Sequence, residues 1–133
     1  MRVLALDYGS KRIGLALGDS NLKIAVPLKS LRNHERVFSE IASILEEKGV
    51  DILLVGLPLT PSGAEGQRAK EVKDFVEKLK SCLPEHVEVV LWDERYTTQE
   101  ALRLMEGLSP RKKKELKDSL SAYVILTEYF ESL

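Results

Sequence analysis

The chain has 133 residues, of which 44% are hydrophobic and 31% charged, a composition typical of a globular protein with one core. Its 20 basic and 21 acidic residues leave a net charge of −1, which argues against a broad basic surface but not against local basic clusters. No apolar run is long enough to span a bilayer, no signal peptide is evident, and the single cysteine, Cys82, excludes an internal disulfide. We therefore expect one cytoplasmic domain, 1–133, that needs no membrane.

The first third of the chain predicts three antiparallel strands joined by short links. Apolar runs over 2–8 and 12–19 indicate a hairpin with Gly9 in its turn, and Ile24–Val26 indicates a third strand. Pro27 has no backbone N–H to give to a sheet, so we expect it near the end of that strand or at the edge of the sheet.

From residue 34 onward, the hydrophobic period alternates between that of a helix and that of a strand. Apolar side chains predict a helix over 34–48 that ends at Gly49, and a second helix over 69–83 that holds Cys82 as a buried thiol. A continuous apolar run at 52–55 predicts a strand buried on both faces, and residues 87–92 predict a further strand. Residues 56–66 are expected to form a long loop.

The last third of the chain predicts two helices. Thr97 and Glu100 have the spacing of a capping box, and Ser109-Pro110 has the pattern that begins a final helix, which carries Asp118. The order of three strands, helix, strand, helix, strand and two helices belongs to the α/β class. It predicts a mixed five-stranded sheet, three antiparallel strands followed by parallel ones, with helices on both faces.

Three acidic positions stand apart from the solvated, charge-rich helix faces. Asp7 ends the first strand, Asp93 and Glu94 end the fifth, and Asp118 emerges from an apolar stripe of the last helix. Taken singly, each has an ordinary explanation as a turn or helix-rim residue. Taken together they match the needs of Mg²⁺, because this ion takes several oxygen ligands and carboxylates from different elements can converge on it.

Basic and hydroxyl side chains accompany these acids, and one further basic run lies at the start of the last helix. The candidates for binding substrate phosphates are Lys11, Arg12, Arg95, Thr97, Lys112, Lys113 and Lys114. Salt bridges and a solvated helix start are the commoner roles of such cations. Beside a metal they would instead hold a nucleic-acid backbone, for which arginine is suited by its bidentate geometry.

Five segments together resemble the YqgF family, also called RuvX. They are Leu6–Gly14, Val55–Leu59, Gly63–Gly66, Trp92–Thr98 and Asp118–Ala122, in the family's order and at suitable spacing along the whole chain. The resemblance implies an RNase H-like fold and a magnesium-dependent nuclease, with Mn²⁺ as an alternative metal. The implied substrates are a Holliday junction or the 5′ end of the 16S rRNA precursor.

The same resemblance assigns the catalytic acids. It implies that Asp7, Glu94 and Asp118 hold one or two metal ions. Successive strand residues face opposite ways, so only one of Asp93 and Glu94 is expected to face the cleft. Glu94 is preferred by analogy with related resolvases.

Two other functions fit the same residues. A domain of this fold could bind structured RNA or branched DNA without cutting it, and the near-neutral net charge leaves that alternative open. An Asp-x-Gly hairpin is also the phosphate-binding turn of actin-like ATPases, which would require a second copy of this domain. For a nuclease, junction resolution requires a homodimer with two active sites, whereas RNA trimming is compatible with a monomer.

Overall fold

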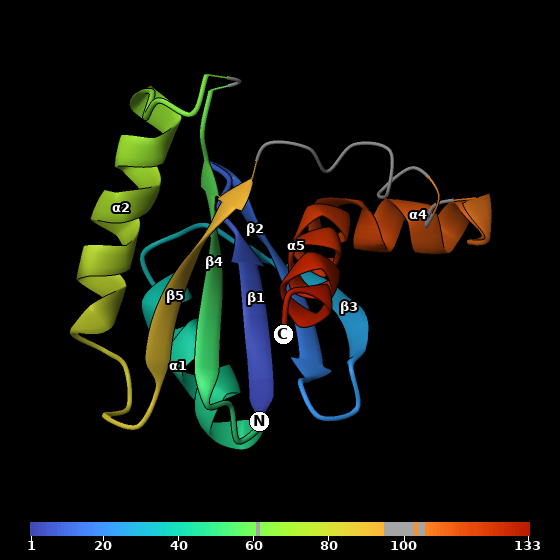
Figure 1. Cartoon of the computed structure of the whole chain (residues 1–133), viewed down its shortest axis with the longest axis horizontal. Helices are drawn as coiled ribbons and strands as arrows, with labels where there is room; N and C mark the ends of the chain where they lie inside the picture. The colour runs from blue at the N-terminus through green and yellow to red at the C-terminus, as the bar shows by residue number, and fades with distance from the viewer. Residues whose placement is uncertain (61, 95–102, 104–105) are drawn as a thin grey trace.

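A five-stranded mixed sheet forms the centre of the molecule (Figure 1). The computed structural model describes residues 1–60, 62–94, 103 and 106–133, and of Glu94 it describes the backbone alone. The strands are β1 (Arg2–Asp7), β2 (Arg12–Asp19), β3 (Ile24–Arg32), β4 (Ile52–Pro58) and β5 (Glu88–Glu94). They lie in the order β3-β2-β1-β4-β5. The first three are antiparallel, whereas β1, β4 and β5 are parallel, as the sequence predicts.

Helices cover both faces of this sheet, which confirms the expected layering. The helices are α1 (Val37–Glu47), α2 (Gln67–Lys80), α4 (Pro110–Leu116) and α5 (Leu120–Glu131), with a 3₁₀ turn, η1 (Lys117–Ser119), between the last two. α1 and α2 pack on one face of the sheet through the larger core cluster. α5 packs on the other face, against the second cluster, and lies in front of the sheet in Figure 1.

Strand β2 divides its side chains sharply between the two faces. Ile13 and Leu15 belong to the core beneath α1 and α2. The alternate positions are small: Gly14 faces η1, and Ala16 and Gly18 face α5. A Cβ added to Gly18 would lie 2.8 Å from the Phe130 ring of α5. This helix can therefore lie so close to β2 only because Gly18 has no side chain. The two faces therefore differ in how near a covering helix can approach.

Several element boundaries differ from those predicted. β3 continues past Pro27 to Arg32. It is an edge strand, which confirms the prediction that this proline lies at the edge of the sheet. α1 begins at Val37 rather than at residue 34. The predicted loop over 56–66 is shorter, because β4 continues through Pro58 and pairs with β5 along its full length.

The ends of α1 and α2 show one correct prediction and one wrong one. Gly49 terminates α1 as predicted, two residues after the last helical residue, and its φ is +60°. Its N–H donates to the Glu46 carbonyl and that of Val50 to the Leu45 carbonyl, the pairing of a Schellman motif. α2 ends at Lys80, so the buried position predicted for Cys82 is wrong, and its thiol is exposed in the following turn.

The final helix is interrupted. Ser109 caps α4 as predicted, with its hydroxyl accepting from the Lys112 N–H. The helix then breaks at η1, so Asp118 lies in a 3₁₀ turn and not within an α-helix. The predicted helix start at Thr97 and Glu100 falls outside the described residues. Over the part of the chain that the structure describes, no helix has the length and apolar character needed to cross a membrane.

The break coincides with contacts that fasten η1 to the sheet. Ser119 is fully buried, and its hydroxyl accepts from the Leu15 N–H at 3.1 Å and donates to the Leu28 carbonyl. These partners lie in β2 and β3, next to the point where the register between the two strands shifts. One hydroxyl thus satisfies a buried N–H and a half-buried carbonyl, and it holds the residue after Asp118 in place.

Replacing Ser119 with alanine should destabilise the fold. The change leaves the Leu15 N–H and the Leu28 carbonyl without this partner in a buried setting, which costs about 1–3 kcal/mol. Urea unfolding should show this loss of free energy. Ser39→Ala, which removes an exposed hydroxyl on α1, is the control and should change stability by less than about 0.5 kcal/mol. Equal midpoints for the two variants would contradict the role assigned to Ser119.

Candidate active site

The turn between β1 and β2 carries the first acid of the site. Asp7 is the last residue of β1, is half-buried, and lies opposite Gly14 in the antiparallel register. Alternation along β1 puts it on the α5 face, with Val3 and Ala5. Gly9 makes the turn tight, since a Cβ at this position would lie 2.4 Å from the Arg12 carbonyl oxygen. The turn therefore sets Asp7 at the edge of the sheet where the parallel strands end.

Neighbouring elements fix this turn through its backbone. Arg68, in the first turn of α2, donates from Nη2 to the Tyr8 carbonyl at 2.7 Å. The Tyr8 ring lies against Phe75 of α2, with ring centroids 4.8 Å apart. Asn33, after β3, donates from Nδ2 to the Gly9 carbonyl at 2.8 Å. The residues that follow Asp7 are therefore held from two sides, which limits the positions that its carboxylate can take.

Asp118 reaches the same face because the strand beneath it has no side chain at Gly14. A Cβ on Gly14 would lie 1.8 Å from the Asp118 carbonyl oxygen, which no real contact permits. Gly14 is in turn the register partner of Asp7. The structure thus places the backbone of Asp118 over the register partner of Asp7, so these two predicted catalytic acids come from opposite ends of the chain to neighbouring positions on one face of the sheet.

Arg12 pairs with Asp118 across the entrance to the site. Its Nη1 lies 3.3 Å from the Asp118 Oδ2, and the two side chains are 64% and 36% exposed. A pair this exposed contributes at most about 1 kcal/mol to stability. Arg12 also lies opposite Arg32 in the β2–β3 register. Like charges in facing positions destabilise a sheet, and an anion bound between them would relieve this repulsion.

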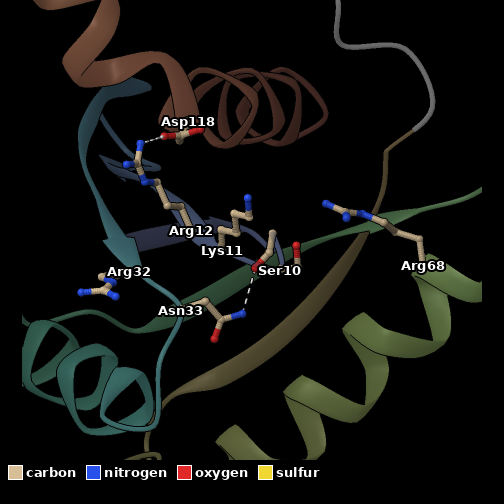
Figure 2. Close-up of a pocket in the computed structure, with 8 residues that line it drawn as sticks. Ser10, Lys11, Arg12, Arg32, Asn33, Arg68 and Asp118 are labelled. Carbon is tan, nitrogen blue, oxygen red and sulfur yellow. Dashed lines mark hydrogen bonds and ion pairs between the residues drawn. The ribbon is translucent and has the colours of Figure 1, made fainter.

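A cleft of about 670 Å³ opens beside these residues (Figure 2). Its lining combines the turn after Asp7 with residues at or near the ends of β2, β3, α2 and η1 and is rich in cations. The lining residues are Gly9, Ser10, Lys11, Arg12, Arg32, Asn33, Arg68 and Asp118. Four of these side chains are basic and one is acidic, so the cleft is suited to a polyanion.

The fifth strand lies two strands from β1 and ends at the same edge of the sheet. Glu94 is the last residue of β5 and pairs with Pro58 in the register. Asp93 precedes it and is exposed. Arg95 and Thr97 lie outside the described residues. Among the side chains that the structure describes, no three acidic, histidine or cysteine groups lie close enough together to hold a metal.

The basic run on α4 does not line the cleft. Lys114 is exposed and lines a separate groove with Lys29, Arg111 and Glu115. Lys113 is half-buried and Lys112 is exposed. The predicted phosphate-binding residues are therefore divided between two places, with Lys11 and Arg12 in the cleft and Lys114 in the groove.

Three residues of the cleft were not predicted from the sequence. Arg32, Asn33 and Arg68 come from β3 and α2, far along the chain from Asp7. The signal for Arg32 would have been a longer third strand, which places it opposite Arg12. For Asn33 and Arg68 no pattern indicates that they bind the turn, because their acceptors are backbone carbonyls and not side chains.

Comparison with known proteins relates the whole chain to one family. A family model described as "RuvX: Holliday junction resolvase" matches residues 1–132. A protein of Sulfurihydrogenibium sp. (strain YO3AOP1), provisionally named a pre-16S rRNA nuclease, is 40% identical over 132 residues, which cover 99% of this chain and 91% of that protein. A protein of Chloroflexus aurantiacus with the same name is 39% identical over 134 residues, covering 98% and 86% of the two chains.

Solved structures confirm the RNase H-like fold. Thermus thermophilus RuvC in complex with a Holliday junction aligns with a TM-score of 0.58 and 14% identity, covering 99% of this chain and 94% of that one. The Fowlpox virus resolvase, also in complex with junction DNA, aligns with a TM-score of 0.66 and 12% identity, covering 99% and 98% of the two chains. At such low identities the likeness shows the shared fold alone.

Adding a methyl group at Gly14 should disrupt the site. Gly14→Ala pushes η1 off the sheet, because the new Cβ collides with the backbone of Asp118 and not with a flexible side chain. We expect a loss of about 1–3 kcal/mol or more in unfolding free energy. Gly107→Ala, where nothing lies within 4 Å of an added Cβ, is the matched control. If Gly14→Ala unfolds at the same urea concentration as Gly107→Ala, the close contact is not as described.

Proposed function

Because the chain belongs to the RuvX family of Holliday junction resolvases, we propose that it is a magnesium-dependent nuclease that hydrolyses phosphodiester bonds. The observation that carries this proposal is the position of the Asp118 backbone over Gly14, the register partner of Asp7, beside a cleft with four basic side chains. Carboxylates next to cations are what a metal-assisted attack on a phosphate requires. The natural setting for such a substrate is the cytoplasm.

The donor atoms fit a hard cation. Asp7 and Asp118 offer carboxylate oxygens on one face of the sheet, the ligands that Mg²⁺ and Mn²⁺ take. We assign Glu94 as the third ligand on backbone grounds. It follows Trp92 by two positions, and Trp92 packs in the core beneath α5, so position 94 has the register of that face. Asp93 has the opposite register.

The metal would supply Lewis acidity, activating a water for in-line attack and stabilising the charge on the leaving 3′-oxygen. The residues of the chain would hold the substrate. Lys11 and Arg12, at the turn after Asp7, and Arg32 across from them provide charge for the phosphates next to the scissile bond. Arg12 would leave Asp118 as a phosphate arrives, since the existing pair is exposed and weak.

The remaining predicted contacts belong to the same proposal. Arg95 and Thr97 follow Glu94 directly in the sequence and would contact the backbone of the bound strand. Lys112, Lys113 and Lys114 would add charge farther from the scissile bond. The oligomeric state depends on the substrate, because a four-way junction needs two sites related by symmetry and a trimmed RNA end needs one.

Changing Asp7 to asparagine should abolish cleavage and keep the fold. The amide has nearly the same size but lacks the charge that holds a divalent cation, so we expect a loss of at least about 10³-fold in rate, equivalent to several kcal/mol. Asp74→Asn, an exposed carboxylate on α2, is the matched control and should retain full activity. Full magnesium-dependent cleavage by folded Asp7→Asn would sink the proposed mechanism.

The substrate can be decided by direct comparison. The wild-type protein should be given a four-way DNA junction and a 16S rRNA precursor side by side, with Mg²⁺ or Mn²⁺ and with Asp7→Asn as the blank. We expect cleavage of one of them that is faster than that of an unbranched, mature control strand. Tight binding of both without any cleavage would support the alternative, a non-catalytic nucleic-acid-binding module.

A further inference from the structure

A second group of cations lies outside the cleft, in a groove between α4 and β3. This groove, with a volume of about 300 Å³, is lined by Lys29, Arg111, Lys114 and Glu115. The three basic side chains are exposed, and they outnumber the one acid. We call it the α4–β3 groove.

The α4–β3 groove adjoins the proposed active site along two connections. On β3, Lys29 precedes Arg32 of the cleft by three residues, a separation of roughly 10 Å along a strand. On the other side, α4 leads through η1 directly to Asp118, four residues after Lys114. α4 packs on β3, so the groove and the cleft are adjacent parts of one surface. Figure 1 shows α4 extending outward from the sheet beyond β3.

The cations of α4 that line the groove share one helical face. Arg111, Lys114 and Glu115 are spaced at i, i+3 and i+4, which places them next to one another on the helix surface. Lys29 faces them from β3. Cations from two separate elements therefore line the same groove, an arrangement that sequence spacing on α4 alone does not produce.

The lining of both places favours a paired nucleic acid over a single strand. Proteins that bind single strands stack the bases on aromatic side chains, each worth about 1–3 kcal/mol. Among the described residues that line the cleft and the α4–β3 groove, none is aromatic. Cations without stacking partners contact phosphates and leave the bases paired.

We infer that the α4–β3 groove binds the phosphate backbone of a double-helical arm that extends from the cleavage site. This inference rests on the proposed nuclease function and adds a second phosphate-binding place next to the cleft. Lys29 and Lys114 contact phosphates of the arm, while the cleft holds the strand next to the scissile bond.

Binding measurements with EDTA present, so that no cleavage occurs, test this inference. The probes are a duplex with a single-stranded extension and the same single strand alone. The double variant Lys29→Ala/Lys114→Ala should bind the duplex probe about tenfold or more weakly, and its slope of log affinity against log salt should fall by about 2. Its affinity for the single strand should change by less than its affinity for the duplex.

The control variant is Lys48→Ala/Lys78→Ala, which removes the same charge from exposed positions outside both sites and should bind both probes as the wild type does. Wild-type affinity and salt slope in the groove variant would overturn the inference, as would equal losses on the two probes. Cleavage by the wild type is scored separately against Asp7→Asn. If the wild type cleaves and the groove variant binds the duplex normally, the role of the α4–β3 groove is disproved and the proposed function stands. If the wild type binds neither probe, the proposed function is disproved as well.

Discussion

Strand β2 has small residues at Gly14, Ala16 and Gly18 beneath the segment that covers it, and this lets the backbone of Asp118 rest directly on the sheet. The buried hydroxyl of Ser119 then fastens this segment to β2 and β3. Because Gly14 is also the partner of Asp7, the same contact decides how near the two acids lie. The chemistry proposed for the site therefore depends on the absence of side chains at one strand as much as on the acids themselves.

Much of the fold follows from local patterns in the sequence. The alternation in β2 and the helical period of α1 depend on neighbouring residues only, so the five strands and the helices α1 and α2 are predicted in the correct order. The misplaced features depend on distant contacts. The 3₁₀ turn at Asp118 forms where Ser119 meets partners 104 and 91 residues away, which no window along the chain contains. The continuation of β3 beyond Pro27 likewise depends on its pairing with β2.

The residues of the candidate site likewise fall into two groups, those that a local sequence pattern predicts and those that distant contacts place there. Asp7 and Asp118 are identifiable because carboxylates at the end of an apolar strand or on an apolar stripe are unusual. Arg32 is not, because a one-residue irregularity between β2 and β3 decides that it lies opposite Arg12. Arg68 bonds to a backbone carbonyl, which carries no side-chain signature. Residues that position a turn through its backbone are thus the part of the site that a sequence conceals best.

The position of α5 at the end of the sequence affects how the protein folds during synthesis. All five strands are contained in residues 2–94, so the sheet can form early during synthesis. In the part of the chain that the structure describes, α5 covers one face of this sheet, with Val3, Ala5 and Leu54. Until residues 117–131 have left the ribosome, this face lacks its cover and Asp7 lacks Asp118 as a neighbour. An unfinished chain therefore exposes apolar surface and lacks one of the proposed metal ligands, and the same late segment supplies both the cover and the ligand.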